Sequence, residues 1–308
     1  MERPISRRGF LKGVMGTAIG GSLLGRPLRA LARNLSERPD HYGMLADLTR
    51  CIGCRRCEAA CNKANNLPPP EVPFDDKSVF EQERRPDERA FTVVNRYKDP
   101  KTEKPVYVKI QCMHCEEPAC ASACLVGALR KTPEGPVVYN ESVCIGCRYC
   151  MSACPFYIPA FEYFDPLSPR IQKCYMCYHR ISKGEVPACV AECPMEALMI
   201  GRRSELLELA RERIRRNPDK YIDHIYGEHE AGGTGWLYIS GVPFEELGFP
   251  TDLPTTPFPE LTRGFLSFVP VVLVAWPALF GGIYLMSKGR EEDSESETTS
   301  VESEKEER

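Results

Sequence analysis

The sixteen cysteines of this 308-residue chain fall into four groups of four, and none is left over. Two groups share the spacing C-x2-C-x2-C-x3-C: Cys51, Cys54, Cys57 and Cys61, then Cys144, Cys147, Cys150 and Cys154. The other two groups have longer gaps, C-x2-C-x4-C-x3-C and C-x2-C-x11-C-x3-C: Cys112, Cys115, Cys120 and Cys124, then Cys174, Cys177, Cys189 and Cys193. Any fold of this chain must accommodate these four groups.

Three thiolates in a tight loop can reach three irons of one [4Fe-4S] cubane, while a fourth cysteine on the following helix points to a second cubane. Gly53 and Gly146 let the loop backbone approach the sulfurs. Structural zinc is the main alternative; because it usually takes two separated C-x2-C pairs, it fits groups two and four better than groups one and three. Disulfides are a further alternative, but clusters inserted before export would occupy every thiol. The spacing predicts four [4Fe-4S] clusters.

The first 32 residues have the layout of an export signal. They carry six basic residues and one acidic residue, with Arg7 and Arg8 before an apolar run that leads to the small residues Ala30 and Ala32. This layout predicts a twin-arginine signal peptide over residues 1–32, with a short buried helix as the alternative. The twin-arginine route carries proteins that are already folded with their cofactors.

A second apolar segment lies near the other end of the chain. Phe265 to Met286 is 22 residues without a charge, which as a helix is about 33 Å long and enough for the ~30 Å core of a bilayer. We predict a transmembrane helix over residues 264–287, with a buried core helix as the alternative. Lys288 and Arg290 follow it, so the positive-inside rule places the C-terminus in the cytoplasm.

The end of the chain is strongly acidic. Residues 291–308 carry nine acidic and two basic residues and have almost no apolar side chains to bury, so we predict a disordered tail over residues 288–308. The formal net charge is −3, and residues 33–290 together carry only about −1. Nucleic acid is therefore not an expected partner.

The stretch between signal and membrane helix predicts an α+β fold. Residues 43–202 hold every cysteine and form the predicted four-cluster ferredoxin-like domain, in which the segment Cys124 to Leu129 repeats as Cys193 to Leu198. Residues 66–109 interrupt this domain and are expected to be a surface extension against a partner or a plain surface loop. Four short apolar runs are typical of strands: Phe91–Val94, Val106–Ile110, Val137–Tyr139 and Leu198–Ile200.

A C-terminal extension is expected over residues 203–260. It begins with an amphipathic helix over residues 204–216, whose apolar face is Leu206, Leu207, Ala210 and Ile214. Residues 242–260 contain five prolines and are expected to be a semi-rigid tether to the membrane.

With all four groups placed, residues 43–202 resemble the four-cluster iron–sulfur beta subunits of dimethyl sulfoxide reductase, nitrate reductase and formate dehydrogenase. Within that superfamily the chain is most similar to the iron–sulfur electron-transfer subunits of periplasmic nickel–iron uptake hydrogenases, the HybA type. Four stretches carry this resemblance: Gln111–Cys115, Cys147–Met151, Tyr226–Thr234 and Gly241–Leu247. The chain departs from the commonest pattern at Cys61 and Cys124, which no proline follows. Proline there is not a ligand, so cluster binding is still expected.

The resemblance implies that ligands cross between the groups, which defines four cluster sets. The first set is Cys51, Cys54, Cys57 and Cys193, and the second set is Cys61, Cys174, Cys177 and Cys189. The third set is Cys112, Cys115, Cys120 and Cys154, and the fourth set is Cys124, Cys144, Cys147 and Cys150. The implied architecture is two interleaved double-cluster modules, the inner one over residues 107–160, with the four clusters in one line.

The resemblance also implies a function and its partners. The chain would take electrons from the small subunit of a periplasmic hydrogenase and pass them to an integral membrane, quinone-reactive subunit. It would lie on the periplasmic side of the inner membrane, with the lipid bilayer around its single span. The alternative is the beta subunit of a molybdenum oxidoreductase such as formate dehydrogenase or dimethyl sulfoxide or polysulfide reductase, with the molybdenum catalytic subunit as partner. Neither an open metal position nor a substrate pocket is evident, so we expect a non-catalytic subunit rather than an enzyme or a zinc scaffold.

Polar residues near the cysteines are candidates for tuning the clusters. His114 lies between two ligands, and because the cysteine count is complete we expect it to make a hydrogen bond or lie at the surface. Five cations adjoin cysteines and either offset the negative charge of the clusters or are ordinary surface charges: Arg55, Arg56, Arg148, Lys173 and Arg180.

Overall fold

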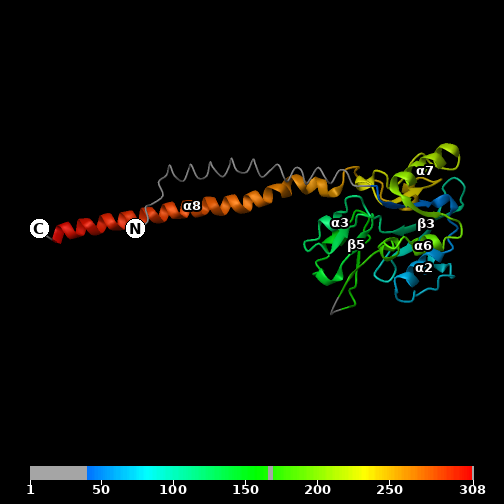
Figure 1. The fold of residues 1–308 in the computed structure, drawn as a ribbon, viewed down its shortest axis with the longest axis horizontal. Helices are drawn as coiled ribbons and strands as arrows, with labels where there is room; N and C mark the ends of the chain where they lie inside the picture. The colour runs from blue at the N-terminus through cyan, green and yellow to red at the C-terminus, as the bar shows by residue number, and fades with distance from the viewer. Residues whose placement is uncertain (1–39, 166–168, 307–308) are drawn as a thin grey trace. The chain divides into compact units, whose positions relative to one another are not determined.

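A computed structural model describes residues 40–165 and 169–306 as short helices and strands followed by one long helix (Figure 1). The predicted signal peptide over residues 1–32 lies outside the described residues. The described chain divides into two compact units after Leu261. The mixture of helix and strand in the first unit confirms the predicted α+β content.

A three-stranded sheet joins the start of this unit to its C-terminal extension. Strand β1 (Tyr42–Asp47) lies in the middle, antiparallel to β8 (Leu198–Arg202) and parallel to β9 (Trp236–Ile239). Met44 of β1 is paired in register with Ile200 of β8 and with Trp236 of β9. The extension after the last cysteine is therefore part of the core of this unit.

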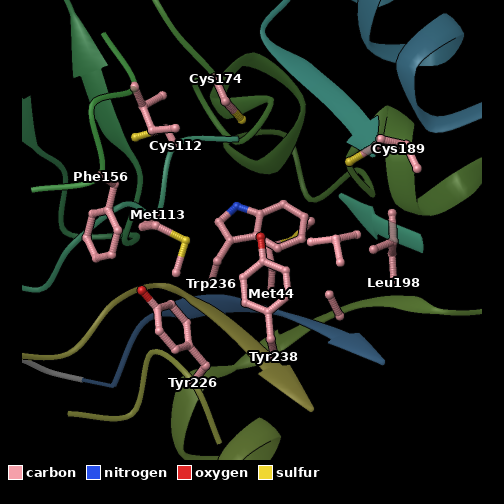
Figure 2. Packing of buried hydrophobic residues seen from close by; sticks show 14 of the residues in the cluster. Met44, Cys112, Met113, Phe156, Cys174, Cys189, Leu198, Tyr226, Trp236 and Tyr238 are labelled. Carbon is pink, nitrogen blue, oxygen red and sulfur yellow. The ribbon is translucent and has the colours of Figure 1, made fainter. Parts of the chain in front are cut away.

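The two faces of this sheet have different neighbours, because side chains alternate along a strand. Leu45, Leu237 and Ile239 face helix α7 (Arg203–Arg216). The buried residues of α7 are those predicted from the sequence: Leu206, Leu207, Ala210 and Ile214. The opposite face carries Met44, Trp236 and Tyr238, which pack among buried cysteines (Figure 2).

Three hairpins complete the strands. Strand β2 (Thr92–Lys98) pairs antiparallel with β3 (Pro105–Gln111), and both fall on apolar runs that predicted strands. The other two hairpins are shorter: β4 (Leu129–Lys131) with β5 (Val137–Tyr139), and β6 (Ala160–Phe161) with β7 (Ile171–Gln172). The insertion over residues 66–109 thus ends in a hairpin whose last strand leads into the second cysteine group.

Short helices follow the cysteine loops and pack in pairs. Helix α2 (Arg56–Ala64) packs against α6 (Ala188–Ala191), and α3 (Ala119–Ser122) packs against α4 (Tyr149–Ser152). These contacts join group one to group four and group two to group three. The remaining short helices are α5 (Tyr178–Ile181), η1 (Leu48–Arg50), η2 (Ser78–Glu81), η3 (Glu141–Val143), η4 (Glu230–Gly232) and η5 (Phe244–Leu247).

The first part of the proline-rich stretch 242–260 packs in the core. Val242, Phe244 and Leu247 are buried, and Phe249 contacts Tyr226 with ring centroids 4.7 Å apart. The sequence pattern concealed this because the apolar side chains are separated by prolines and acidic residues. The later part also contacts the core, because Leu253 and Phe258 pack against it and the Ala231 N–H donates to the carbonyl of Pro254 at 2.8 Å. The stretch expected to be a tether is therefore largely packed against the domain up to Phe258.

Helix α8 (Phe258–Glu306) contains the predicted transmembrane segment. Within the described residues, Phe258–Lys288 is the one helix long and apolar enough to cross a membrane, judged by length and by its mean hydropathy of 2.0. The helix continues through residues 288–306, where we expected disorder. Glutamate and lysine are good helix formers, and extending an existing helix avoids the cost of nucleation.

Candidate metal centres

A hollow beside the central sheet gathers cysteines from the two ends of the domain. Four of its lining residues are the cysteines of the first set: Cys51, Cys54, Cys57 and Cys193. Burial, together with the nearby sulfurs of Cys193 and Cys54, raises the pKa of the Cys51 thiol to about 11. Cys193 of group four, rather than Cys61 of group one, lines this first hollow.

In a second hollow, Cys61 of group one lies with three cysteines of group four. Its lining includes every cysteine of the second set: Cys61, Cys174, Cys177 and Cys189. The pKa of the Cys61 thiol lies well above its usual range because of burial and because of the nearby sulfurs of this set. All four of these cysteines are buried.

In the third and fourth sets, as in the first two, the four cysteines of a set lie near one another. The pKa of the Cys115 thiol is raised by burial and then by three sulfurs, those of Cys154, Cys112 and Cys120. Burial raises the pKa of the Cys150 thiol to about 11, with further contributions from Cys124, Cys144 and Cys147. Each of these two cysteines is thus influenced by the three remaining members of its set.

Neighbouring sulfurs also link one set to the next. The pKa of Cys57 in the first set is raised by burial and by Cys189 of the second. Burial raises the pKa of Cys174 in the second set to about 12, and Cys112 of the third contributes. The pKa of Cys120 in the third set is raised by burial and, among other sulfurs, by Cys150 of the fourth. The four sets therefore follow one another in the order first, second, third, fourth.

The two C-x2-C-x2-C loops have matching backbones. Gly53 and Gly146 have φ angles of +66° and +67°, and Arg55 and Arg148 both have φ of +62°. A side chain at Gly53 would place its Cβ 2.3 Å from Cδ1 of Tyr107. Glycine is therefore required at residue 53 by both its backbone conformation and its neighbour.

The predicted internal repeat is also a structural repeat. The Ala128 N–H donates to Sγ of Cys124 at 3.1 Å, and the Ala197 N–H donates to Sγ of Cys193 at 3.3 Å. The intervening Gly127 has a positive φ of +65°. Each turn thus aims a backbone donor at the sulfur of its fourth cysteine. At Cys61 the helix α2 instead continues to Ala64, since no proline or turn ends it.

These donor sets fit cubane iron–sulfur clusters. Each set offers four thiols, the ligand set of a [4Fe-4S] cluster. Within residues 40–165 and 169–306, no group of three or more His, Cys, Asp or Glu side chains is arranged to hold a single metal ion, as structural zinc requires. A cubane is larger than one ion, so its thiolates stand further apart. Iron must displace the protons that the raised thiol pKa values retain.

The predicted tuning residues differ in their surroundings. Arg55 is buried, but its guanidinium is paired with Glu58 at 3.0 Å and donates to the carbonyl of Pro73. Lys173 is fully buried, and its Nζ donates to the carbonyls of Val137 and Cys174 at 2.5 and 3.0 Å. Arg55 thus anchors the insertion, whereas Lys173 lies among the ligands.

His114 is buried rather than at the surface. Its Nδ1 accepts a hydrogen bond from the Val137 N–H at 2.8 Å. Burial and the nearby Lys173 lower the pKa of His114 well below its usual value, so the ring is neutral at pH 7. The predicted hydrogen-bonding role is therefore the one observed.

Two residues beside the hollows were not singled out from the sequence. Lys109 of β3 is 3% exposed and lines both the first and the second hollow. Trp236 of β9 is fully buried and lines the second hollow. A charged residue within an apolar strand, three residues before Cys112, is the signal that could have identified Lys109. Nothing local to Trp236 indicates its position, because its strand pairs with β1 across the domain.

Comparisons with known proteins identify the family. Two models of the 4Fe-4S dicluster domain match residues 50–128 and 104–203. A protein from Nitratidesulfovibrio vulgaris is 54% identical over 252 residues, which cover 82% of this chain and 68% of that protein. The hydrogenase-2 operon protein HybA of Escherichia coli O157:H7 is 36% identical over 278 residues, covering 80% of this chain and 84% of HybA.

A further relative is a subunit of a different enzyme. The iron–sulfur subunit of the nitrate-inducible formate dehydrogenase of Escherichia coli K12 is 32% identical over 247 residues, 78% of this chain and 82% of that subunit. Both named relatives are thus matched over most of their length. The chain therefore belongs to the superfamily of [4Fe-4S] electron-transfer subunits that includes the formate dehydrogenase iron–sulfur subunit, as a member of the HybA type.

Proposed function

We propose that this chain carries electrons through four [4Fe-4S] clusters from a periplasmic hydrogenase to an integral membrane subunit that reduces quinone. The observation that carries the proposal is the grouping of cysteines from separate parts of the chain into four neighbourhoods. Similarity to HybA over most of both chains supports a hydrogenase as the electron source.

We assign one cluster to each cysteine set, with the ligands crossed between groups. The pairing of α2 with α6 and of α3 with α4 supports two interleaved modules. When bound, each cluster supplies a one-electron couple. The cysteines hold the clusters, the backbone donors of Ala128 and Ala197 stabilise thiolate sulfurs, and the apolar walls of the hollows exclude water.

The order of the sets supports a linear path with an exposed site at each end. Cys147 of the fourth set is exposed and Cys54 of the first set is partly exposed, whereas the second set is buried. Exposed apolar side chains adjoin both terminal sets: Ile52 and Met195 at the first, and Leu125 and Ile145 at the fourth. Such patches are typical of protein interfaces. We assign the hydrogenase small subunit and the quinone-reactive membrane subunit to these two ends.

The paired arginines near the start of the chain and the apolar helix α8 support a location for the protein. The paired arginines Arg7 and Arg8 support export by the twin-arginine route, and the apolar part of α8 supports a single membrane span. Lys288 and Arg290 support a cytoplasmic C-terminus, which leaves the cluster-binding unit on the periplasmic side of the inner membrane.

Membranes that contain the protein provide the test. Hydrogenase oxidation of H2 releases two protons and two electrons, and a quinone takes up two of each to form quinol. We expect H2 to bleach the visible absorbance of the clusters and to yield quinol, and we expect neither change in membranes from a strain lacking this chain. Bleaching by formate but not by H2 would instead establish the molybdenum-enzyme alternative. Bleaching by neither donor would refute both roles.

A further inference from the structure

A lysine and a tryptophan lie together between the first and second hollows. Nζ of Lys109 is 4.7 Å from the centre of the Trp236 ring, and both residues are buried. Lys109 lines both hollows, whereas Trp236 lines only the second. In Figure 2 the nitrogen edge of the indole faces the side on which Cys112 and Cys174 lie.

The ammonium group of Lys109 is fixed by neutral partners. Its Nζ donates to Oγ1 of Thr92 at 2.7 Å and to Oε1 of Gln111 at 2.8 Å, and the Gln111 amide is held by the hydroxyl of Tyr238. In the part of the chain that the structure describes, no carboxylate lies within ion-pair distance of this ammonium. A buried cation is costly without an anion nearby, so Lys109 requires negative charge from its surroundings.

Cluster-bound thiolates would supply that charge. Lys109 lines the first hollow together with Cys57, and it lines the second hollow together with Cys189 and Cys174. Cys57 belongs to the first set and the other two belong to the second. Two clusters bound by these thiolates would each contribute negative charge on a different side of one ammonium group.

The indole of Trp236 provides an independent observation. Its Nε1 is buried and has no hydrogen-bond partner among the described residues. Buried donors are almost always paired, and an indole N–H can only donate. The backbone N–H of the same residue is satisfied by the carbonyl of Met113, so the orphan lies in the side chain alone. Trp236 lines the second hollow, whose candidate ligands are cysteine sulfurs.

We propose that Lys109 and Trp236 set the reduction potentials of the first two clusters. Lys109 is the shared counter-charge of both, and the Trp236 indole donates a hydrogen bond to a sulfur at the second. Reduction adds one electron, and so one negative charge, to a cluster, taken from its neighbour in the line. A fixed cation and a fixed N–H donor stabilise that added charge and therefore raise the potential. This inference rests on the proposed binding of clusters by the first two sets.

The test is an anaerobic redox titration of the purified protein, followed by visible absorbance and fitted to four one-electron steps. We expect Lys109→Met to lower two of the four potentials by at least a tenfold change in the reduction equilibrium, about 59 mV for a one-electron couple. We expect Trp236→Phe, which keeps an aromatic ring but lacks the N–H, to lower one. The double variant should still have only two lowered potentials, because Trp236 acts on a cluster that Lys109 also affects.

The controls separate this inference from a general loss of charge or of structure. Lys98→Met removes a positive charge from an exposed side chain and should shift no potential. Lys109→Arg keeps the charge and should lower neither potential as far as Lys109→Met does. If Lys109→Met loses iron, Trp236→Phe carries the test alone.

Three outcomes would overturn the inference. They are unshifted potentials in variants with full iron content, three lowered potentials in the double variant, and equal shifts with Lys98→Met. These results would leave the proposed clusters in place. An iron content far below four clusters in the unaltered protein would instead refute the proposed function.

Discussion

Replacing Gly53 with alanine should destabilise the first cluster set far more than the same change at Gly146 destabilises the fourth. The two glycines occupy the same position in matching C-x2-C-x2-C loops, with φ angles of +66° and +67°. An added Cβ at residue 53 would lie 2.3 Å from the Tyr107 ring, whereas one at residue 146 would lie 3.7 Å from the Phe161 ring. The pair therefore shares backbone strain but differs in steric clash.

Backbone strain and steric clash both contribute to the loss of stability. A non-glycine residue in the left-handed region costs roughly 1–2 kcal/mol, and this applies to both variants. Forcing a side chain into a filled space costs roughly 1–3 kcal/mol more, and this applies only at Gly53 because Tyr107 must move. We therefore expect Gly53→Ala to cost about 2–5 kcal/mol and Gly146→Ala about 1–2 kcal/mol.

The assay is an anaerobic guanidinium titration followed by the visible absorbance of the clusters, with iron counted per chain. Tyr107→Ala removes the ring that the new methyl group meets. In that background Gly53→Ala should lower the stability only by the cost of the left-handed backbone. The coupling between the two changes should be roughly 1–3 kcal/mol. Equal midpoints for Gly53→Ala and Gly146→Ala, or no relief by Tyr107→Ala, would refute the reasoning.

Two further changes test the packing of the domain and its export. Glu116 pairs with His41 at 2.6 Å, Lys131 at 3.3 Å and Arg203 at 3.6 Å, and although burial opposes it these partners hold its pKa at about 2. Glu116→Gln should therefore cost roughly 3 kcal/mol in the same titration, while Glu71→Gln at an exposed pair should leave the midpoint unchanged. Replacing Arg7 and Arg8 by lysine keeps the charge but removes the guanidinium pair, so the precursor should remain in the cytoplasm loaded with iron; normal periplasmic levels would show that the pair is incidental.

Local patterns in the sequence were sufficient to predict several elements. The apolar face of α7 follows from helical periodicity, and the strands β2, β3, β5 and β8 follow from short apolar runs. The repeated turn after Cys124 and Cys193 was evident from the matching spacing of cysteine, alanine and leucine. Each of these signals lies within a few residues of the element that it predicts.

Features that depend on distant contacts were missed. Trp236 reaches the second hollow only because β9 pairs with β1 in parallel, a pairing between residues almost 200 positions apart. The burial of Phe244 likewise depends on aromatic partners elsewhere in the extension. Lys109 was hidden because a lysine within a strand is usually a surface residue, and only its position between two hollows gives it another role.

The crossed assignment of ligands is the centre of this account, and iron content measured in paired cysteine variants tests it most directly. Protein purified without oxygen should contain about sixteen irons per chain. Cys193→Ala should remove one cluster, and with it about four of these irons. Adding Cys51→Ala should cost no further iron, because both cysteines belong to the first set and coupled changes are not additive. Adding Cys174→Ala should remove a second cluster. Loss of a second cluster with Cys51→Ala but not with Cys174→Ala would show that ligands follow the sequence groups, and would contradict the account.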